Sequence, residues 1–334
     1  ASPAETAAAV ALAVFPSTTP AQRPAAVALV DEAEWPVAIA AAVLMAPPVR
    51  APILFSGPGG APEASEEALA ALDPQGSKET SGARGFAFGD VTVPDGAGGI
   101  ETIRAAGAGA AEEPAAIAAA IADLRDRLFG SPPEAIVLAP LEGPGFAAPA
   151  AAWAARSGDP VLFAEEKALP KPTEEALKEH VKAPVYVLGP SSAIAGSVLK
   201  RVRKLGNPVK RVAAEDPVAA ALAFARFGDG SFGWNVDDPG HGFVLARDDA
   251  PLDAAAAAPL SAAGTWGPLL LTDSAGTLPP EVRSYFLDVK PGYTTNPTRA
   301  YYNHVWVIGD QEAIDVKQQA EVNELAELAK VGGE

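Results

Sequence analysis

The chain repeats one pattern of apolar and small residues three times, and this repetition constrains its fold more than any other feature. Each copy is a short apolar segment, an alanine-rich segment and a second short apolar segment. The copies are VALVDEAEWPVAIAAAVLMAPPVRAPILFS from Val27, AIVLAPLEGPGFAAPAAAWAARSGDPVLFAE from Ala135 and GFVLARDDAPLDAAAAAPLSAAGTWGPLLLTD from Gly242. Their starting points lie about 107 residues apart, the length of a small α/β unit. A repeated strand–helix–strand unit is therefore predicted.

The segments that follow each second apolar run are also similar. GAPEASEEALAAL, ALPKPTEEALKEH and TLPPEVRSYFL place proline near a helix start and acidic residues in the first turn, as a helix N-terminus favours. A third strand is predicted at Ala183 to Gly189 and His304 to Gly309, with a weaker copy at Gly85 to Asp90. IETIRAAG and NPVKRVAAE predict a fourth strand. The third copy lacks it and ends in a long helix from Asp310 to about Val331.

Short, wholly apolar strands that alternate with helices indicate an α/β fold, in which parallel sheets are covered on both faces. We expect each unit to run helix–β–α–β–α–β–α–β. The expected units are residues 1–132, 133–239 and 240–334, of which the last is incomplete.

An alanine-rich helix is predicted in each third of the chain: ETAAAVALAVF, EEPAAIAAAIADL and EDPVAAALAFARF. The first, from Glu5 to Phe15, is a spare copy ahead of the first unit and is too short to be stable alone. We expect it to dock at a position shared between units, which would bring the first and third units together.

Composition and charge exclude several kinds of partner and site. The chain is 49% hydrophobic, which is enough to bury a sizeable core. Its net charge of −17 argues against nucleic acid as a partner, because an acidic surface repels phosphates. It has no cysteine, which excludes cysteine zinc sites and cysteine nucleophiles. No apolar run approaches the roughly 20 residues of a membrane span. The composition and the opening Ala1-Ser2-Pro3-Ala4 favour a secreted protein.

The glycine-rich turn Gly57-Pro-Gly-Gly60 has the outline of a phosphate-binding loop. The equivalent places in the other copies read AEEKA and TDSAG, and no Gly-Lys-Ser/Thr follows the turn. Glu63 and Glu66 put negative charge where a phosphate would sit. GDGSFG, from Gly228 to Gly233, follows a helix and not a strand, which is the wrong context for a dinucleotide site. No cofactor is expected.

Several segments together resemble the cell-wall-binding repeat family (type 2 repeats) of bacterial surface proteins. They are PILFS from Pro52, PVLF from Pro160, PLLLT from Pro268, VYVLGPSSAIAGSVLKRV from Val185 and VKRVAAEDPVAAALA from Val209. The resemblance covers nearly the whole chain and is strongest in the second copy. It implies three Rossmann-like modules around a pseudo-threefold axis, at the cell surface or in the cell wall, that bind an anionic wall polymer or glycan. The chain departs from the family where Asp216-Pro217 replaces an arginine.

One basic cluster stands out against the acidic background. Its members are Lys200, Arg201, Arg203, Lys204, Lys210 and Arg211. One interpretation is a solvated helix face with cations near its C-terminus. The other is a polymer-binding site, since arginine grips phosphate or carboxylate with two hydrogen bonds.

Other polar residues give weaker signals. The three histidines, His180, His241 and His304, have no metal-binding spacing, and their scarcity argues against acid–base catalysis. No Gly-x-Ser-x-Gly motif is present, so the chain is not expected to be an enzyme. Acidic residues follow predicted strands at the carboxyl edge of each sheet, where a divalent cation could bind: Asp31, Glu165 and Asp273. Whether a metal binds is left open.

Three functions fit these observations to different degrees. The leading hypothesis is a non-catalytic cell-surface protein that binds an anionic cell-wall polymer through three repeats. The second is a self-assembling structural subunit of a surface layer or extracellular filament. The third, an α/β enzyme or small-ligand receptor, is disfavoured by the missing motifs.

Overall fold

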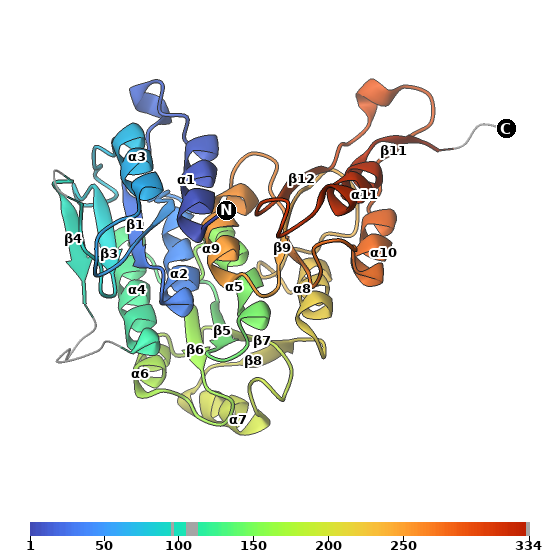
Figure 1. Ribbon diagram of the computed structural model, residues 1–334. Helices are drawn as coiled ribbons and strands as arrows, with labels where there is room; N and C mark the ends of the chain where they lie inside the picture. Colours follow the sequence, from blue (N-terminus) through green and yellow to red (C-terminus); the bar gives the residue numbers. More distant parts are fainter. Residues whose placement is uncertain (95–96, 105–112, 332–334) are drawn as a thin grey trace.

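Three parallel β-sheets, each flanked by helices, account for most of the molecule (Figure 1). A computed structural model of the chain describes residues 1–94, 97–104 and 113–331. The predicted α/β class with repeated parallel-sheet units is confirmed. The division of the chain into domains at residues 132/133 and 239/240 stays a prediction.

The strand order is the same in each sheet. The first sheet has the order β2-β1-β3-β4, from β1 (Val27–Asp31), β2 (Ile53–Ser56), β3 (Gly85–Phe88) and β4 (Ile100–Ile103). The second has the order β6-β5-β7-β8, from β5 (Ile136–Pro140), β6 (Val161–Ala164), β7 (Val185–Leu188) and β8 (Val209–Val212). The third has the order β10-β9-β12, from β9 (Gly242–Arg247), β10 (Leu269–Thr272) and β12 (His304–Val307). All these strand pairs are parallel.

The first crossover helix of each sheet faces the centre of the molecule. These helices are α2 (Trp35–Ala41), continued by the 3-10 helix η2 (Ala42–Met45), α5 (Pro144–Ser157) and α9 (Pro251–Ala262). All three pack against one another (Figure 1). They can approach closely because the shared surface is alanine; Ala254 to Ala258, for example, are each at most 1% exposed. The strands beside them are apolar throughout because helices cover both sheet faces.

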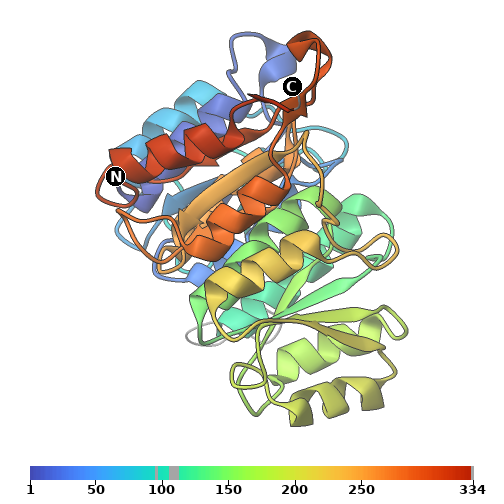
Figure 2. The same cartoon turned by 90° about the vertical axis from the view of Figure 1, so that its right-hand side faces the viewer.

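The other faces of the sheets carry a second set of helices. These are α3 (Glu63–Leu72), α6 (Lys171–Glu179), α7 (Gly196–Leu205), α10 (Pro280–Asp288) and α11 (Val316–Ala326). In both views α6 and α7 lie at the lower end of the molecule (Figure 2). A separate hydrophobic cluster, which includes Ile136, Leu177, Val198 and Val202, fills the space between the second sheet and these two helices.

The alanine-rich helices α1 (Pro3–Val14), α4 (Pro114–Phe129) and α8 (Pro217–Arg226) join neighbouring sheets in the same way. Helix α4 contacts α2 on one side and β6 and α6 on the other, and α8 contacts α5 and then β10 and α10. Helix α1 contacts α9 of the third sheet and β2 and α3 of the first. The expected shared position of the N-terminal helix is confirmed, and the equivalence of the three helices is the pseudo-threefold arrangement that the resemblance implied.

The first sheet departs from the expected order of elements. A helix was expected between its third and fourth strands, as α7 lies between β7 and β8. The described residues between β3 and β4, 89–94 and 97–99, form no helix. The connection is shorter than the second sheet's residues 189–208, so it has no length for a crossover helix.

The end of the third sheet also differs from the sequence-based expectation. Helix α11 begins at Val316 and ends at Ala326, whereas the expected helix ran from Asp310 to about Val331. Ala329–Lys330 form β13, which pairs in parallel with β11 (Gly292–Tyr293) and not with β12. The cause is local. Gly206 reverses the chain after α7 with a φ of 103°, whereas Glu327 after α11 is extended and carries the chain onward.

Candidate functional site

The glycine turn after β2 is closed on itself. The N–H of Gly57 donates to the carbonyl of Gly60 at 3.2 Å, and the N–H of Gly60 donates to the carbonyl of Gly57 at 3.1 Å. A phosphate cradle needs such N–H groups free. The interpretation of this segment as a βα turn therefore fits its geometry.

The predicted basic cluster lies on α7 and β8, at the outer side of the second sheet (Figure 1). Helix α7 buries Val198, Leu199 and Val202 on one face, so its charged residues are held on the opposite, exposed face. Its last turn contains Arg203 and Lys204, where cations interact favourably with the helix dipole. Strand β8 is the edge of the sheet and carries the remaining two cations.

Three of the six cations, Arg201, Lys210 and Arg211, bind polar groups of this same chain. Arg201 donates two hydrogen bonds to Glu174 of α6, at 2.6 and 2.9 Å. Hydrogen bonds from Arg201 and Lys178 lower the pKa of Glu174 to about 2. Lys210 forms an ion pair with Asp229, which also accepts a hydrogen bond from the Tyr186 hydroxyl. These carboxylates reduce the charge that Arg201 and Lys210 present to a ligand.

Arg211 has a structural role. Its guanidinium is half-buried and donates to the backbone carbonyls of Gly189 and Ile194, in the turn that follows β7. Burial lowers the pKa of this guanidinium. Arg211 therefore ties β8 to the start of the β7–α7 connection.

The remaining three cations form a continuous patch, which we call the α7 patch: Lys200, Arg203 and Lys204. Arg203 and Lys204 lie three and four residues after Lys200 along the helix, so both are neighbours of Lys200 on the helix surface. All three are exposed, and none has an ion pair within the described part of the chain. Arg203 makes one long contact, 3.5 Å, to the carbonyl of Val209.

The histidines and the strand-end carboxylates do not assemble into one site. His180 pairs with Asp126 at 3.0 Å and His241 with Asp238 at 3.1 Å, while the His304 ring lies against Trp306. The strand-end residues Asp31, Glu165 and Asp273 belong to three different sheets. The described residues contain no group of three or more His, Asp or Glu placed to hold a metal ion.

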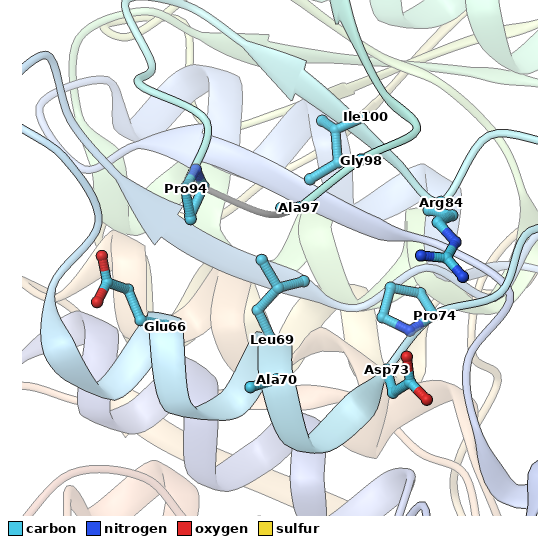
Figure 3. A pocket seen from close by; sticks show the side chains of 10 residues that line it. All are labelled: Glu66, Leu69, Ala70, Asp73, Pro74, Arg84, Pro94, Ala97, Gly98 and Ile100. Carbon is cyan, nitrogen blue, oxygen red and sulfur yellow. The ribbon is translucent and has the colours of Figure 1, made fainter.

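Sequence reasoning missed an open groove on the first sheet. It has a volume of about 550 Å³ and lies between α3 and the connection that leads into β4 (Figure 3). Leu69 and Ala70 of α3 form one wall, Ile100 of β4 forms another, and the polar side chains of Glu66 and Arg84 lie at its rim. The signal that could have revealed it is the short spacing between GFAFGD and IETIRAAG, which leaves no room for a helix.

The chain is thus an α/β protein of several parallel-sheet units flanked by helices. No family model matches it, and no curated protein matches it in sequence. Among solved structures, Cwp6 from Clostridium difficile matches 98% of this chain with a TM-score of 0.74 at 17% identity. Cwp8 from the same organism matches 97% with a TM-score of 0.68 at 20% identity. The match covers 47% and 50% of those chains, so this chain spans about half the length of each.

No described helix has both the length and the apolar character needed to cross a membrane.

Proposed function

We propose that this chain is a non-catalytic, cell-wall-associated protein that binds an anionic wall polymer. Two observations support the wall association. The fold is shared over nearly the whole chain with Cwp6 and Cwp8, which are C. difficile cell wall proteins. The PILFS, PVLF and PLLLT segments resemble cell-wall-binding repeats. An extracellular location at the cell surface or in the wall follows from this proposal.

The α7 patch is the observation that supports an anionic ligand. A chain with a net charge of −17 repels polyanions unless positive charge is concentrated locally. Lys200, Arg203 and Lys204 supply such a concentration on one exposed helix face. An extended polymer with regularly spaced phosphate or carboxylate groups can contact several cations at once, and Arg203 offers two parallel N–H donors.

The test removes the patch without changing helix propensity. The triple variant Lys200→Gln, Arg203→Gln, Lys204→Gln is compared with a control of equal charge change, Lys167→Gln, Lys171→Gln, Lys317→Gln, whose lysines are exposed elsewhere. We expect the patch variant to bind purified anionic wall polymer roughly tenfold more weakly at low salt, from three exposed charge contacts. The control should retain binding. Equal weakening of both triples would contradict a specific site on α7.

A second candidate function, a self-assembling structural subunit, is favoured by exposed aromatic side chains near the third sheet. Tyr301 is 74% exposed and Tyr302 is 54% exposed, in the segment before β12. Large exposed apolar side chains that lie together mark interaction surfaces. A particle size that grows with protein concentration in the absence of polymer, and is lost in Tyr301→Ser, Tyr302→Ser, would favour this second function.

A further inference from the structure

The outer edge of the third sheet, at β12, is open in the described part of the chain, whereas the corresponding strands of the other two sheets are each covered by a fourth strand. β3 pairs with β4 and β7 pairs with β8 on their outer sides. Among the described residues, β12 pairs only with β9. The segment around Ala329, which is equivalent to β8 by its place in the sequence, pairs with β11 instead (Figure 1).

The backbone of β12 is oriented to accept a further strand. The N–H groups of His304 and Ile308 donate to the β9 side, at His241 (3.0 Å) and Leu245 (2.9 Å). Since successive N–H groups alternate in direction along a strand, those of Val305 and Val307 point to the outer edge. Val185 of β7 is the equivalent of Val305, and its N–H donates to the carbonyl of Pro208, just before β8, at 2.8 Å.

A groove of about 590 Å³ runs beside this edge. Its walls are largely apolar and come from α1, α9 and the end of β12; they include Ala9, Val10, Leu260 and Trp306. Trp306 is 40% exposed. In the second sheet β8 lies along β7 and contacts α8. Helix α1 packs on α9 of the third sheet as α8 packs on α5 of the second sheet. The groove between α1 and β12 therefore lies where a fourth strand of the third sheet would run.

The contacts of Arg211 in β8 indicate which side chain a fourth strand of the third sheet would need. Its guanidinium donates to the carbonyls of Gly189 and Ile194. The equivalent carbonyls in the third sheet belong to Gly309 and Ile314, and that of Ile314 already accepts from Gln319 at 2.8 Å. Gly309 and Ala1 line the groove together with Glu5, whose carboxylate also accepts a hydrogen bond from the Ser2 N–H at 2.7 Å. A strand with a basic residue at the Arg211 position is therefore favoured.

We propose that the outer edge of β12 binds an extended segment of another protein as a fourth, parallel strand. The segment has the pattern of β8: apolar residues at its first and fourth positions and arginine at its third. Backbone hydrogen bonds to the Val305 and Val307 positions supply affinity, and the groove and the Gly309 carbonyl supply specificity.

The first experiment uses a labelled peptide, NPVKRVAA, copied from residues 207–214 of this chain, and measures fluorescence anisotropy against the whole protein. Saturable binding is expected. Val307→Pro should weaken it about tenfold or more, because proline removes an outward N–H and its ring blocks the approach. Proline is tolerated in an edge strand at such a position. The matched control is Val316→Pro, at the first position of α11, where proline fits and the valine is 59% exposed.

Two further measurements keep the test decisive. Ala9→Tyr fills the groove from the exposed side of α1 without altering β12, and it should weaken binding even if Val307→Pro is poorly folded. The peptide NPVKQVAA should bind several-fold more weakly than NPVKRVAA, because glutamine is shorter and uncharged. Absence of saturable binding, or equal binding by Val307→Pro and Val316→Pro, would overturn the proposal. So would self-association of the wild type that Val307→Pro abolishes, since a second copy would then occupy the edge.

Discussion

His180 and Asp126 link two segments that are distant in the sequence. His180 follows α6 of the second sheet, and its Nε2 lies 3.0 Å from Asp126 Oδ2 on α4. The hydrogen bond to Asp126 raises the pKa of His180, and the charges of Asp126 and Glu179 act in the same direction, while burial and Arg125 oppose it. Because the folded state favours the charged imidazole, protonation of His180 stabilises the packing of α6 on α4.

This raised pKa predicts a pH dependence of stability. The contribution of His180 should be fully present below its unfolded pKa of about 6.5 and should be lost as pH rises through its higher folded pKa. We expect the free energy of unfolding of the wild type to fall, relative to His180→Gln, as the pH rises above about 6.5. Urea denaturation of both proteins across this range measures the difference. Parallel pH profiles for the two proteins would show that the pair contributes nothing.

The ends of α7 and α11 show how one residue directs a whole element. Gly206 follows α7 in the left-handed region, and the chain turns back into β8. Glu327 follows α11 with φ −67° and ψ 140°, so the chain continues outward to β13. A residue with a Cβ adopts the left-handed conformation only at a cost. The presence of glycine at one helix end and its absence at the other therefore accompany a closed edge in the second sheet and an open edge in the third.

Substitutions at Gly196, which begins α7, and at Gly206, which follows it, test this role. Gly206→Ala forces a Cβ into the left-handed region and places it 2.9 Å from Val181 Cγ1, so we expect a loss of about 1–2 kcal/mol in unfolding free energy. Gly196→Ala, at the start of the same helix and facing open space, should leave stability unchanged or raise it by up to about 0.5 kcal/mol. Chemical denaturation gives both values. A Gly206→Ala variant as stable as Gly196→Ala would refute the argument.

Helix α1 adds to the direct packing of α2 on α9 in joining the first and third sheets. This helix contacts α9 of the third sheet and α3 of the first, and its alanines Ala7 and Ala11 are each 1% exposed. Short side chains allow this close packing, so the contact has little room for added volume. The first and third sheets are thereby joined through a helix that precedes both in the sequence.

A pair of alanine substitutions measures this packing. Ala11→Leu adds volume to the buried side of α1 and should lower the free energy of unfolding by about 1–3 kcal/mol through overpacking. Ala9→Leu makes the same change on the exposed side and should be nearly neutral. Thermal or urea unfolding distinguishes them. If Ala11→Leu were as stable as Ala9→Leu, the packing of α1 on α9 and α3 would not be tight.

The sequence by itself determined the strands of the three main sheets, their first crossover helices and the shared position of α1, but it wrongly predicted a helix between β3 and β4. Apolar runs such as PVLF and alanine-rich segments such as EDPVAAALAFARF report local periodicity, and their repetition places each element by analogy with its copies. The exposed face of α7 was also within reach, because its apolar residues recur at helical spacing.

Only the tertiary structure decided which charges are free and which strand edge is open. Arg201 pairs with Glu174 and Lys210 pairs with Asp229, and both carboxylates come from other elements. Arg211 donates to the Gly189 carbonyl, so three of the six predicted basic residues make contacts within the chain. The pairing of β13 with β11 likewise joins segments that no local pattern connects. Ion pairs and strand pairing depend on distances between residues far apart in the chain, whereas periodicity reports only on neighbours.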